Sequence, residues 1–378
     1  MSTRAIGPGN QRRHAYRMHC FRLSRGGLGV ATALAIFVGV VGAQTPPRAP
    51  VVVQGETIRI SYGATEADWA VLDTHPNVKE IVLPSPPNTP PVWTITAREF
   101  AHVANCPNLE RLVIGHRRYV FSDDALRSLA GLKKLRSLGL GLPVSDVGIV
   151  HLAGLTSLEE LGLGGTRVGD PGLASLQDLT NLRKLSLYGT PVTDAGVAHL
   201  ARLTKLEDLG LGDTQVGDGA MVTIARFTKL QELDLQHTNV TDAGMARLKG
   251  LTSLRWIALT GTNVTSRGFA NLSGMTAMTH VEADGTHIDD RALDSMRKMT
   301  GLKSLHIANT RFTEAGLRGL SAFPELEWLN INGVAATDSV IPTLLGLKKL
   351  RTIEMNGTRI TAAGEARLKA AGIARVNR

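Results

Sequence analysis

Imidazole and carboxylate side chains cluster in one short stretch of this 378-residue chain. His280, Glu282 and Asp284 stand at alternate positions, and His306 follows Glu282 by 24 residues. Alternate side chains of a β-strand point to the same face, so the first three would share one surface. Imidazole and carboxylate groups together can bind a transition metal or exchange protons with a substrate. The cluster therefore raises two possibilities, a metal-assisted hydrolase and an ordinary polar surface.

Two tryptophans in the same region point to binding. Trp256 precedes and Trp328 follows His280 by whole multiples of 24 residues, and Asp234 is related to Glu282 in the same way. An exposed indole is costly to leave in water, and Trp is enriched in binding hot spots. We interpret these three residues as parts of the same ligand surface as the cluster. The alternative is that both tryptophans lie flat on neighbouring side chains and bind nothing.

A strict repeat supplies the elements that must position these residues. The first apolar residue of an L-x-L pair recurs in nine units, at Leu161, Leu185, Leu209, Leu233, Ile257, Val281, Leu305, Leu329 and Ile353. A fixed period of this length indicates a solenoid. The alternation predicts one short strand per unit, with its apolar residues inward, and parallel strands that stack into a concave wall. All seven candidate residues fall at outward positions of that wall.

Each strand should be followed by a corner and a short helix on the convex side. Pro171 favours the first helical position, so we expect Asp170 to be the helix N-cap. The same slot holds Asp146, Asp194, Asp218, Asp242, Ser266, Asp290 and Asp338. A threonine recurs at the corner, at Thr166, Thr190, Thr214, Thr238, Thr262, Thr286, Thr310 and Thr358. Its hydroxyl is expected to bond the backbone of its own or the next turn.

The unit L-x-x-L-x-L-x-x-T-x-V-T-D-A-G-L resembles the leucine-rich repeat family. It is similar to the cysteine-containing subclass, in a bacterial secreted variant that carries Thr at the corner, and the resemblance spans about residues 51–378. It implies an α/β solenoid, a horseshoe or arc with a parallel concave sheet and convex helices. The family binds proteins and other ligands of many kinds, so the resemblance implies no particular ligand.

The chain ahead of the repeats looks like an export leader. Six arginines without an acidic residue, an apolar run over 26–41 and small residues at Val41 and Ala43 predict a signal peptide over 1–43. Translation would start at Met1 or Met18, and an uncleaved membrane anchor is the alternative. We expect a Pro-rich linker over 44–54, divergent repeats with a Pro-rich insert over 55–110, leucine-rich repeats over 111–361 and a polar C-terminal cap over 362–378.

Charge and cysteine content restrict the partners. The formal net charge is +9, but without the six leader arginines 36 basic residues face 33 acidic ones. So weak a field removes the main support for nucleic-acid binding. Once Cys20 leaves with the leader, Cys106 has no intramolecular disulfide partner, and we assign it a buried packing role.

We therefore expect a non-enzymatic scaffold of the cell envelope, secreted or periplasmic, without a metal or other cofactor. Its ligand would be a protein or an envelope polymer, bound on the concave wall by a monomer with no membrane span after cleavage. The alternatives are a metal-assisted hydrolase that uses His280, Glu282, Asp284 and His306, and a structural envelope component without a specific ligand.

Overall fold

The computed structural model describes residues 51–61, 63–83, 93–115 and 119–377. All of these residues belong to one compact unit. The predicted signal peptide, the first part of the predicted linker and the Pro-rich insert lie outside the described residues. Within those residues, no helix has the length and apolar character needed to cross a membrane.

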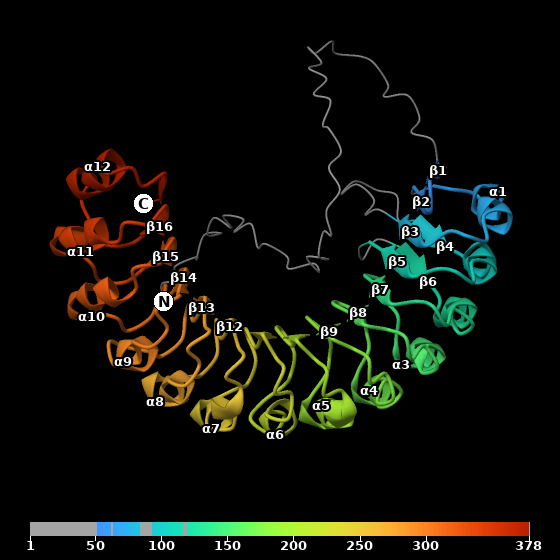
Figure 1. The fold of residues 1–378 in the computed structure, drawn as a ribbon, viewed down its shortest axis with the longest axis horizontal. Helices are drawn as coiled ribbons and strands as arrows, with labels where there is room; N and C mark the ends of the chain where they lie inside the picture. The colour runs from blue at the N-terminus through green and yellow to red at the C-terminus, as the bar shows by residue number, and fades with distance from the viewer. Residues whose placement is uncertain (1–50, 62, 84–92, 116–118, 378) are drawn as a thin grey trace, which may run out of the picture. The chain divides into compact units, whose positions relative to one another are not determined.

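A fifteen-stranded sheet lines the inner side of the solenoid (Figure 1). Apart from one antiparallel pair at its start, neighbouring strands are parallel and follow one another in chain order. The strands are β1 (Val51–Gln54), β2 (Thr57–Ile60), β3 (Glu80–Leu83), β5 (Arg111–Ile114), β7 (Ser137–Leu140), β8 (Glu160–Gly162), β9 (Lys184–Ser186), β10 (Asp208–Gly210), β11 (Glu232–Asp234), β12 (Trp256–Ala258), β13 (His280–Glu282), β14 (Ser304–His306), β15 (Trp328–Asn330), β16 (Thr352–Glu354) and β17 (Arg375–Asn377). A separate pair joins β4 (Trp93–Ile95) to β6 (Tyr119–Phe121). The predicted parallel concave sheet is confirmed.

Short helices cover the outer side of the sheet (Figure 1). The α-helices are α1 (Glu66–Trp69), α2 (Ala97–Ala101), α3 (Asp146–Ile149), α4 (Asp170–Ala174), α5 (Asp194–His199), α6 (Met221–Ile224), α7 (Asp242–Met245), α8 (Ser266–Phe269), α9 (Ala292–Met296), α10 (Glu314–Arg318), α11 (Ile341–Gly346) and α12 (Ala362–Ala370). The 3-10 helices are η1 (Ala70–Thr74), η2 (His102–Asn105), η3 (Asp123–Leu129), η4 (Val150–Leu152), η5 (Leu200–Arg202), η6 (Leu248–Gly250), η7 (Ala270–Leu272), η8 (Gly319–Ala322) and η9 (Asp338–Val340).

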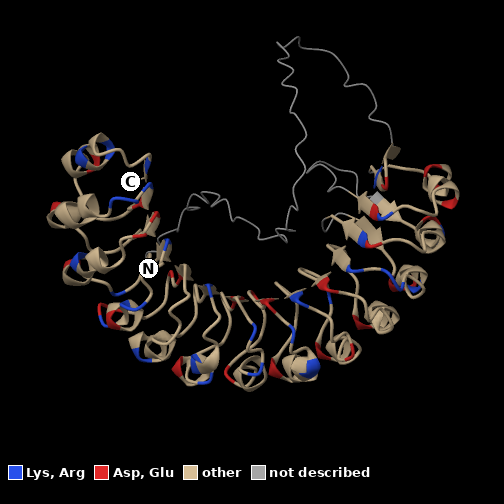
Figure 2. Cartoon of the chain, viewed as in Figure 1, with Lys and Arg blue, Asp and Glu red and all other residues tan. Residues whose placement is uncertain are grey.

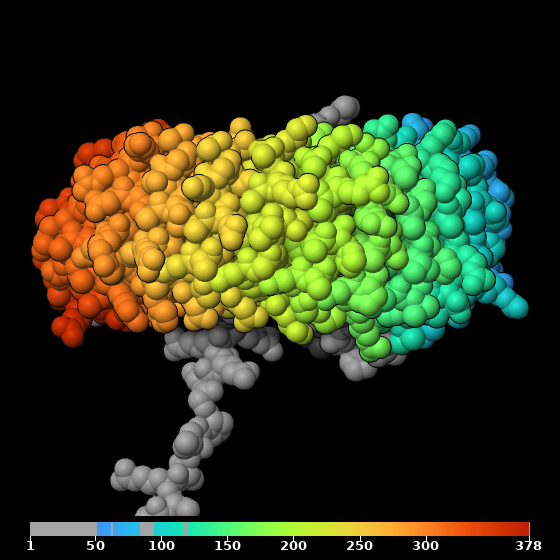
Figure 3. Space-filling view, turned by 90° about the horizontal axis from the view of Figure 1, so that it is seen from below, coloured from blue at the N-terminus to red at the C-terminus, as the bar shows by residue number. Residues whose placement is uncertain are grey.

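One continuous apolar core runs between the strands and the helices. Leu209 and Leu211 of one unit and Leu200 and Leu203 of the preceding helical segment are fully buried, and the equivalent residues repeat this in the other units. The space-filling view shows the units as successive bands along the outer side (Figure 3). Charged residues of both signs lie interspersed along the solenoid (Figure 2). Cys106 is buried in the core, as expected.

The linker prediction is wrong at its C-terminal end. Val51–Gln54 form β1, which pairs antiparallel with β2 in the register Val51 to Ile60. Three consecutive valines favour a strand, and Gly55 adopts the positive φ of 57° that the tight turn requires. The Pro-rich composition therefore ends at Pro50, and the solenoid begins there with a hairpin.

The N-cap prediction is also wrong by one residue. Thr193, and not Asp194, caps α5, because its hydroxyl accepts a hydrogen bond from the amide of Ala195 at 3.2 Å. Asp170 of the preceding unit instead accepts hydrogen bonds from the amide and the hydroxyl of Thr193, at 2.9 and 2.6 Å. The helix-initial acid thus links its unit to the next one. We call this series the aspartate ladder, and it continues through Asp123 to Ser145, Asp146 to Gly169, Asp194 to Gly217, Asp218 to Thr241, Asp242 to Thr265, Asp290 to Thr313, Glu314 to Thr337 and Asp338 to Thr361.

The corner threonines behave as predicted. Thr190 donates its hydroxyl proton to the carbonyl oxygen of Leu187 at 2.6 Å, within its own turn. The same bond recurs at Thr214, Thr238, Thr262, Thr286, Thr310 and Thr358. These hydroxyls satisfy carbonyls where each strand leaves the sheet, which fixes the corner in nearly every unit.

Candidate ligand-binding surface on the concave wall

The sheet register brings the candidate residues onto five adjacent strands, from β11 to β15. Trp256 on β12 lies opposite His280 on β13, and Glu282 lies opposite His306 on β14. Trp328 follows on β15. Because neighbouring parallel strands lie about 4.8 Å apart, the two indoles are about 14 Å apart along the wall. The predicted columns of outward residues are therefore confirmed.

Trp256 and Glu282 form the first pair of this surface. The indole Nε1 of Trp256 donates a hydrogen bond to Oε1 of Glu282 at 3.1 Å. The tryptophan faces the concave wall and is half-buried. The contact holds the ring in one orientation and engages the carboxylate that lies opposite His306 in the sheet register.

Trp328 and His306 form the second pair. Their rings meet edge to face, with centroids 4.7 Å apart and an interplanar angle of 60°. Only 14% of the His306 side chain is exposed, and its Nε2 is buried without a hydrogen-bond partner among the described residues. Burial lowers the pKa of His306, although the nearby carboxylates of Glu282 and Glu354 oppose that shift. Burial therefore favours the neutral form of the imidazole.

Asp284 lies next to His306 but forms no strong ion pair with it. Its Oδ2 is 4.0 Å from Nδ1 of His306, while its oxygens accept hydrogen bonds from the amide of Ala308 at 2.6 Å and from Asn330 at 3.1 Å. Burial raises the pKa of Asp284 to about 7 against the effect of these bonds, and Glu282 and Glu354 add to the increase. Both members of the close contact are thus shifted toward their neutral forms.

His280 and Asp234 occupy the margins of the surface. His280 is exposed, and its Nδ1 lies 2.8 Å from the hydroxyl of Thr279. Partial burial of the ring lowers its pKa. Asp234 is nearly buried and accepts hydrogen bonds from the amide and the side chain of Gln236 on its own strand segment, at 3.0 and 3.2 Å. Asp234 lies on β11, two strands away from His280 on β13.

The groups that a hydrolase would use contact other side chains. Glu282 accepts a hydrogen bond from Trp256, the ring of His306 meets that of Trp328, and His280 contacts Thr279. Within the part of the chain that the structure describes, no group of three His, Cys, Asp or Glu residues is arranged to hold a metal ion. What the wall offers is two fixed aromatic rings bordered by hydrogen-bonding groups.

A second group of polar residues escaped the sequence analysis. The residue after the third outward position has positive φ in successive units, and it is glycine at 165, 189, 261, 285, 333 and 357. Asp213, His237 and Asn309 take this position with φ of 55°, 52° and 52°. The hydroxyl of Tyr188 donates to Asp213, whose other oxygen lies 3.0 Å from Nδ1 of His237. A non-glycine residue with positive φ costs roughly 1 kcal/mol of stability. The replacement of glycine at this repeat position was therefore the sequence signal that could have identified these residues.

Comparison with known proteins identifies the fold. Residues 228–249 match the family described as Leucine Rich repeat. An internalin (inlF) from Listeria monocytogenes superposes with a TM-score of 0.65 at 21% sequence identity, covering 85% of this chain and 86% of that one. A leucine-rich repeat protein from Leptospira interrogans gives 0.53 at 14% identity, covering 85% and 89%. No curated protein sequence matches. The chain is a leucine-rich repeat solenoid.

Proposed function

We propose that this chain is a non-enzymatic scaffold that binds a protein ligand on the concave wall between β11 and β16. The observation that carries the proposal is the pair of half-buried indoles at Trp256 and Trp328, with the exposed His280 between them. Several earlier outward positions of the wall are glycine, as at Gly162, Gly210 and Gly212, although Lys184 and Tyr188 stand beside them, and both indoles of the wall lie in this later region.

The two indoles suit a binding role because they are already fixed. Trp256 is held by Glu282 and Trp328 by His306. Aromatic anchors that keep one conformation lose little entropy when a ligand arrives, and such residues dominate the affinity of many interfaces. Burial favours the neutral forms of His306 and Asp284, which lowers the cost of covering this wall with a partner.

We also propose that the scaffold works outside the cytoplasm, in the envelope or beyond it. Support comes from the arginine-bearing, apolar leader over 1–43. On this proposal the working protein begins at Gln44, and its binding wall meets ligands in the periplasm or at the cell surface.

Site-specific crosslinking tests the proposed binding site. A photoreactive amino acid at His280 is expected to give a discrete protein adduct in the envelope fraction of the source cells, on a chain whose N-terminus is Gln44. The matched control carries the same group at Asp208, which occupies the equivalent position on β10. Trp256→Ala with Trp328→Ala should reduce the His280 adduct at least about tenfold, since each indole is a candidate hot spot.

The result that would reject this footprint is a His280 adduct that survives loss of both indoles, or an equal adduct at the Asp208 position. Circular dichroism of the double variant verifies that the solenoid remains folded.

A further inference from the structure

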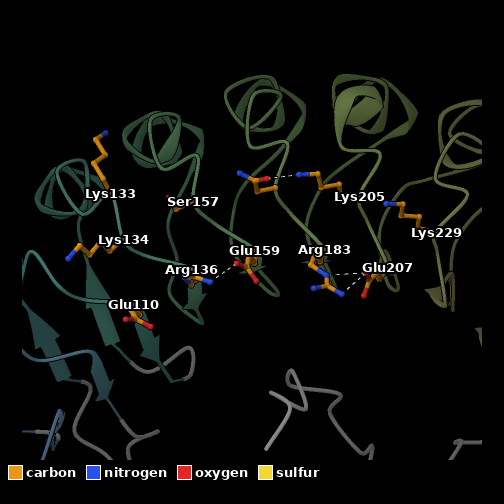
Figure 4. A pocket seen from close by; sticks show the side chains of 11 residues that line it. Glu110, Lys133, Lys134, Arg136, Ser157, Glu159, Arg183, Lys205, Glu207 and Lys229 are labelled. Carbon is orange, nitrogen blue, oxygen red and sulfur yellow. Dashed lines mark hydrogen bonds and ion pairs between the residues drawn. The ribbon is translucent and has the colours of Figure 1, made fainter. Parts of the chain in front are cut away.

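A groove of about 670 Å³ lies on one flank of the solenoid, far along the chain from the Trp256 and Trp328 surface. It runs past the N-terminal ends of β5 to β10, and Figure 4 shows its side chains in two rows. We call it the flank groove. It is lined by Glu110, Lys133, Lys134, Arg136, Ser157, Glu159, Asn181, Arg183, Lys205, Glu207 and Lys229.

The row nearer the strands alternates in charge and neutralises itself. Each of its residues immediately precedes a strand, in the order Glu110, Arg136, Glu159, Arg183 and Glu207. Arg136 contacts Glu159 at 3.1 Å, and Arg183 contacts Glu207 at 2.7 Å (Figure 4). These arginines therefore offer little free positive charge to a ligand.

The row nearer the helices keeps its positive charge. Lys134 and Lys205 donate to the amide oxygens of Asn108 and Asn181, both at 2.7 Å, and Lys133 donates to the carbonyl of Gly154 at 3.1 Å. Lys229 is exposed on the next unit. Among the described residues, no carboxylate lies within ion-pair distance of these four lysines. Their partners are neutral, so the groove has six cations against three carboxylates.

The lysine row is a local feature and not a property of the repeat. The position held by Lys134, Lys205 and Lys229 is occupied farther along by Ser253, Ala277 and Gly301. In the last units of the array the same position holds Glu325 and Lys349, which pair with each other at 2.6 Å. Among the described residues, this row of lysines without carboxylate partners thus lies beside the early units, although the chain without its leader arginines has only 36 basic against 33 acidic residues.

We propose that the flank groove binds an extended acidic peptide segment of a partner protein, with carboxylates spaced along it. The lysine row would receive the carboxylates, and Ser157 and Asn181 can hydrogen-bond the peptide backbone between them. Glu110, Glu159 and Glu207 recur along the inner row and repel a chain that is anionic at every residue. This mixture of signs selects a peptide with interspersed acidic residues over a continuous polyanion.

The dimensions agree with a short extended segment. The groove crosses six successive units, and five strand spacings of about 4.8 Å give a length of about 24 Å. An extended peptide advances about 3.3 Å per residue, so about seven residues fill it. Lys134 and Lys205 are three units apart, which corresponds to carboxylates about four residues apart.

The test uses a fluorescein-labelled peptide of about twelve residues in which Glu and Ser alternate. Fluorescence anisotropy should show binding by the full chain that weakens as salt increases, because the contacts are ionic. Lys205→Glu with Lys229→Glu should weaken binding by at least about tenfold. The matched control, Lys249→Glu with Lys298→Glu, makes the same change in net charge on exposed lysines outside the groove and should stay within about twofold of the wild type.

Three results would overturn the proposal. Equal losses in the two double variants would show binding by net charge alone, and a Lys and Ser peptide of the same length that bound as well would exclude a cationic site. Inorganic polyphosphate could also compete with the peptide for the same lysines. If it displaced the peptide at a lower concentration of negative charges than the peptide itself carries, the groove would bind a continuous polyanion. None of these results bears on the His280 crosslink, because the two surfaces share no residue.

Discussion

Asp284 and His306 on the concave wall have pKa values shifted toward the neutral form, because burial disfavours the charged form of each side chain. Burial raises the pKa of Asp284 to about 7 and lowers that of His306. The two shifts act on stability in opposite directions. The folded state holds its Asp284 proton more tightly than the unfolded state, so that contribution is complete below about pH 4 and is lost as pH rises through 7. His306 contributes above its ordinary pKa and loses its contribution as pH falls.

Replacing Asp284 by Asn isolates the carboxyl contribution. Between pH 5 and 8 the free energy of unfolding of the wild type should fall relative to Asp284→Asn, by on the order of 1 to 3 kcal/mol. Urea unfolding at a series of pH values measures this difference. Asp124→Asn is the control, because Asp124 is 79% exposed in its side chain, and it should keep the wild-type profile. Parallel profiles for the wild type and Asp284→Asn would contradict the assignment.

Between neighbouring units, the aspartate ladder explains a sequence pattern that helix propensity does not. The helix-initial acid is followed two residues later by glycine in most units, a poor residue for a helix. At Gly244 an added methyl group would overlap the carboxylate of Asp218 from the preceding unit, and the same overlap recurs at Gly172, Gly196, Gly268, Gly316 and Gly364. The glycine leaves room for the carboxylate of the preceding unit, so the two positions together make one contact between neighbouring units.

A double-mutant cycle tests this coupling. Asp218→Ala removes the acceptor for the amide and the hydroxyl of Thr241, which bond it at 2.8 and 2.6 Å, and should cost about 1 to 3 kcal/mol. Gly244→Ala should cost a similar amount alone and much less in the Asp218→Ala background, where the overlap is gone. A coupling energy of about 1 kcal/mol or more is expected.

The control for that cycle is Gly250→Ala, whose added methyl group meets no atom within 4 Å. It should change stability by less than about 0.5 kcal/mol. Additive costs at Asp218 and Gly244, measured by urea unfolding, would disprove the steric link.

The sequence predicts the strands, the columns of outward residues and the corner threonines, because each follows from a period that repeats within one unit. It misassigns Asp170 because the same spacing allows two roles for this carboxylate. The carboxylate could cap its own helix, or it could accept hydrogen bonds from Thr193 of the next unit. It does not predict that the indole of Trp256 turns toward Glu282. Pairings between units depend on side-chain direction, which spacing alone leaves open.

For the molecule as a whole, stability is carried from neighbour to neighbour. Each strand within the array bonds only the strands beside it, and the aspartate ladder joins residues 22 to 26 positions apart. Such an array behaves as a row of coupled units, so a destabilised interior unit uncouples the unfolding of the units on its two sides. One tryptophan lies in each half of the array, since Trp69 is buried in the early repeats and Trp328 is half-buried in the late ones.

Two core truncations should therefore unfold the chain in different ways. Leu209 on β10 is fully buried near the middle of the array, and Ile353 on β16 is fully buried near its end. Each change to Ala removes about 2 to 5 kcal/mol of local stability. In variants that retain only Trp69 or only Trp328, urea unfolding followed by fluorescence should give coincident midpoints for the wild type and separated midpoints for Leu209→Ala. Ile353→Ala should move the Trp328 midpoint and leave that of Trp69 nearly unchanged. Coincident shifts of both probes in both variants would instead show that the whole array unfolds as one cooperative unit, because coupling between neighbours would then exceed the loss at any single unit.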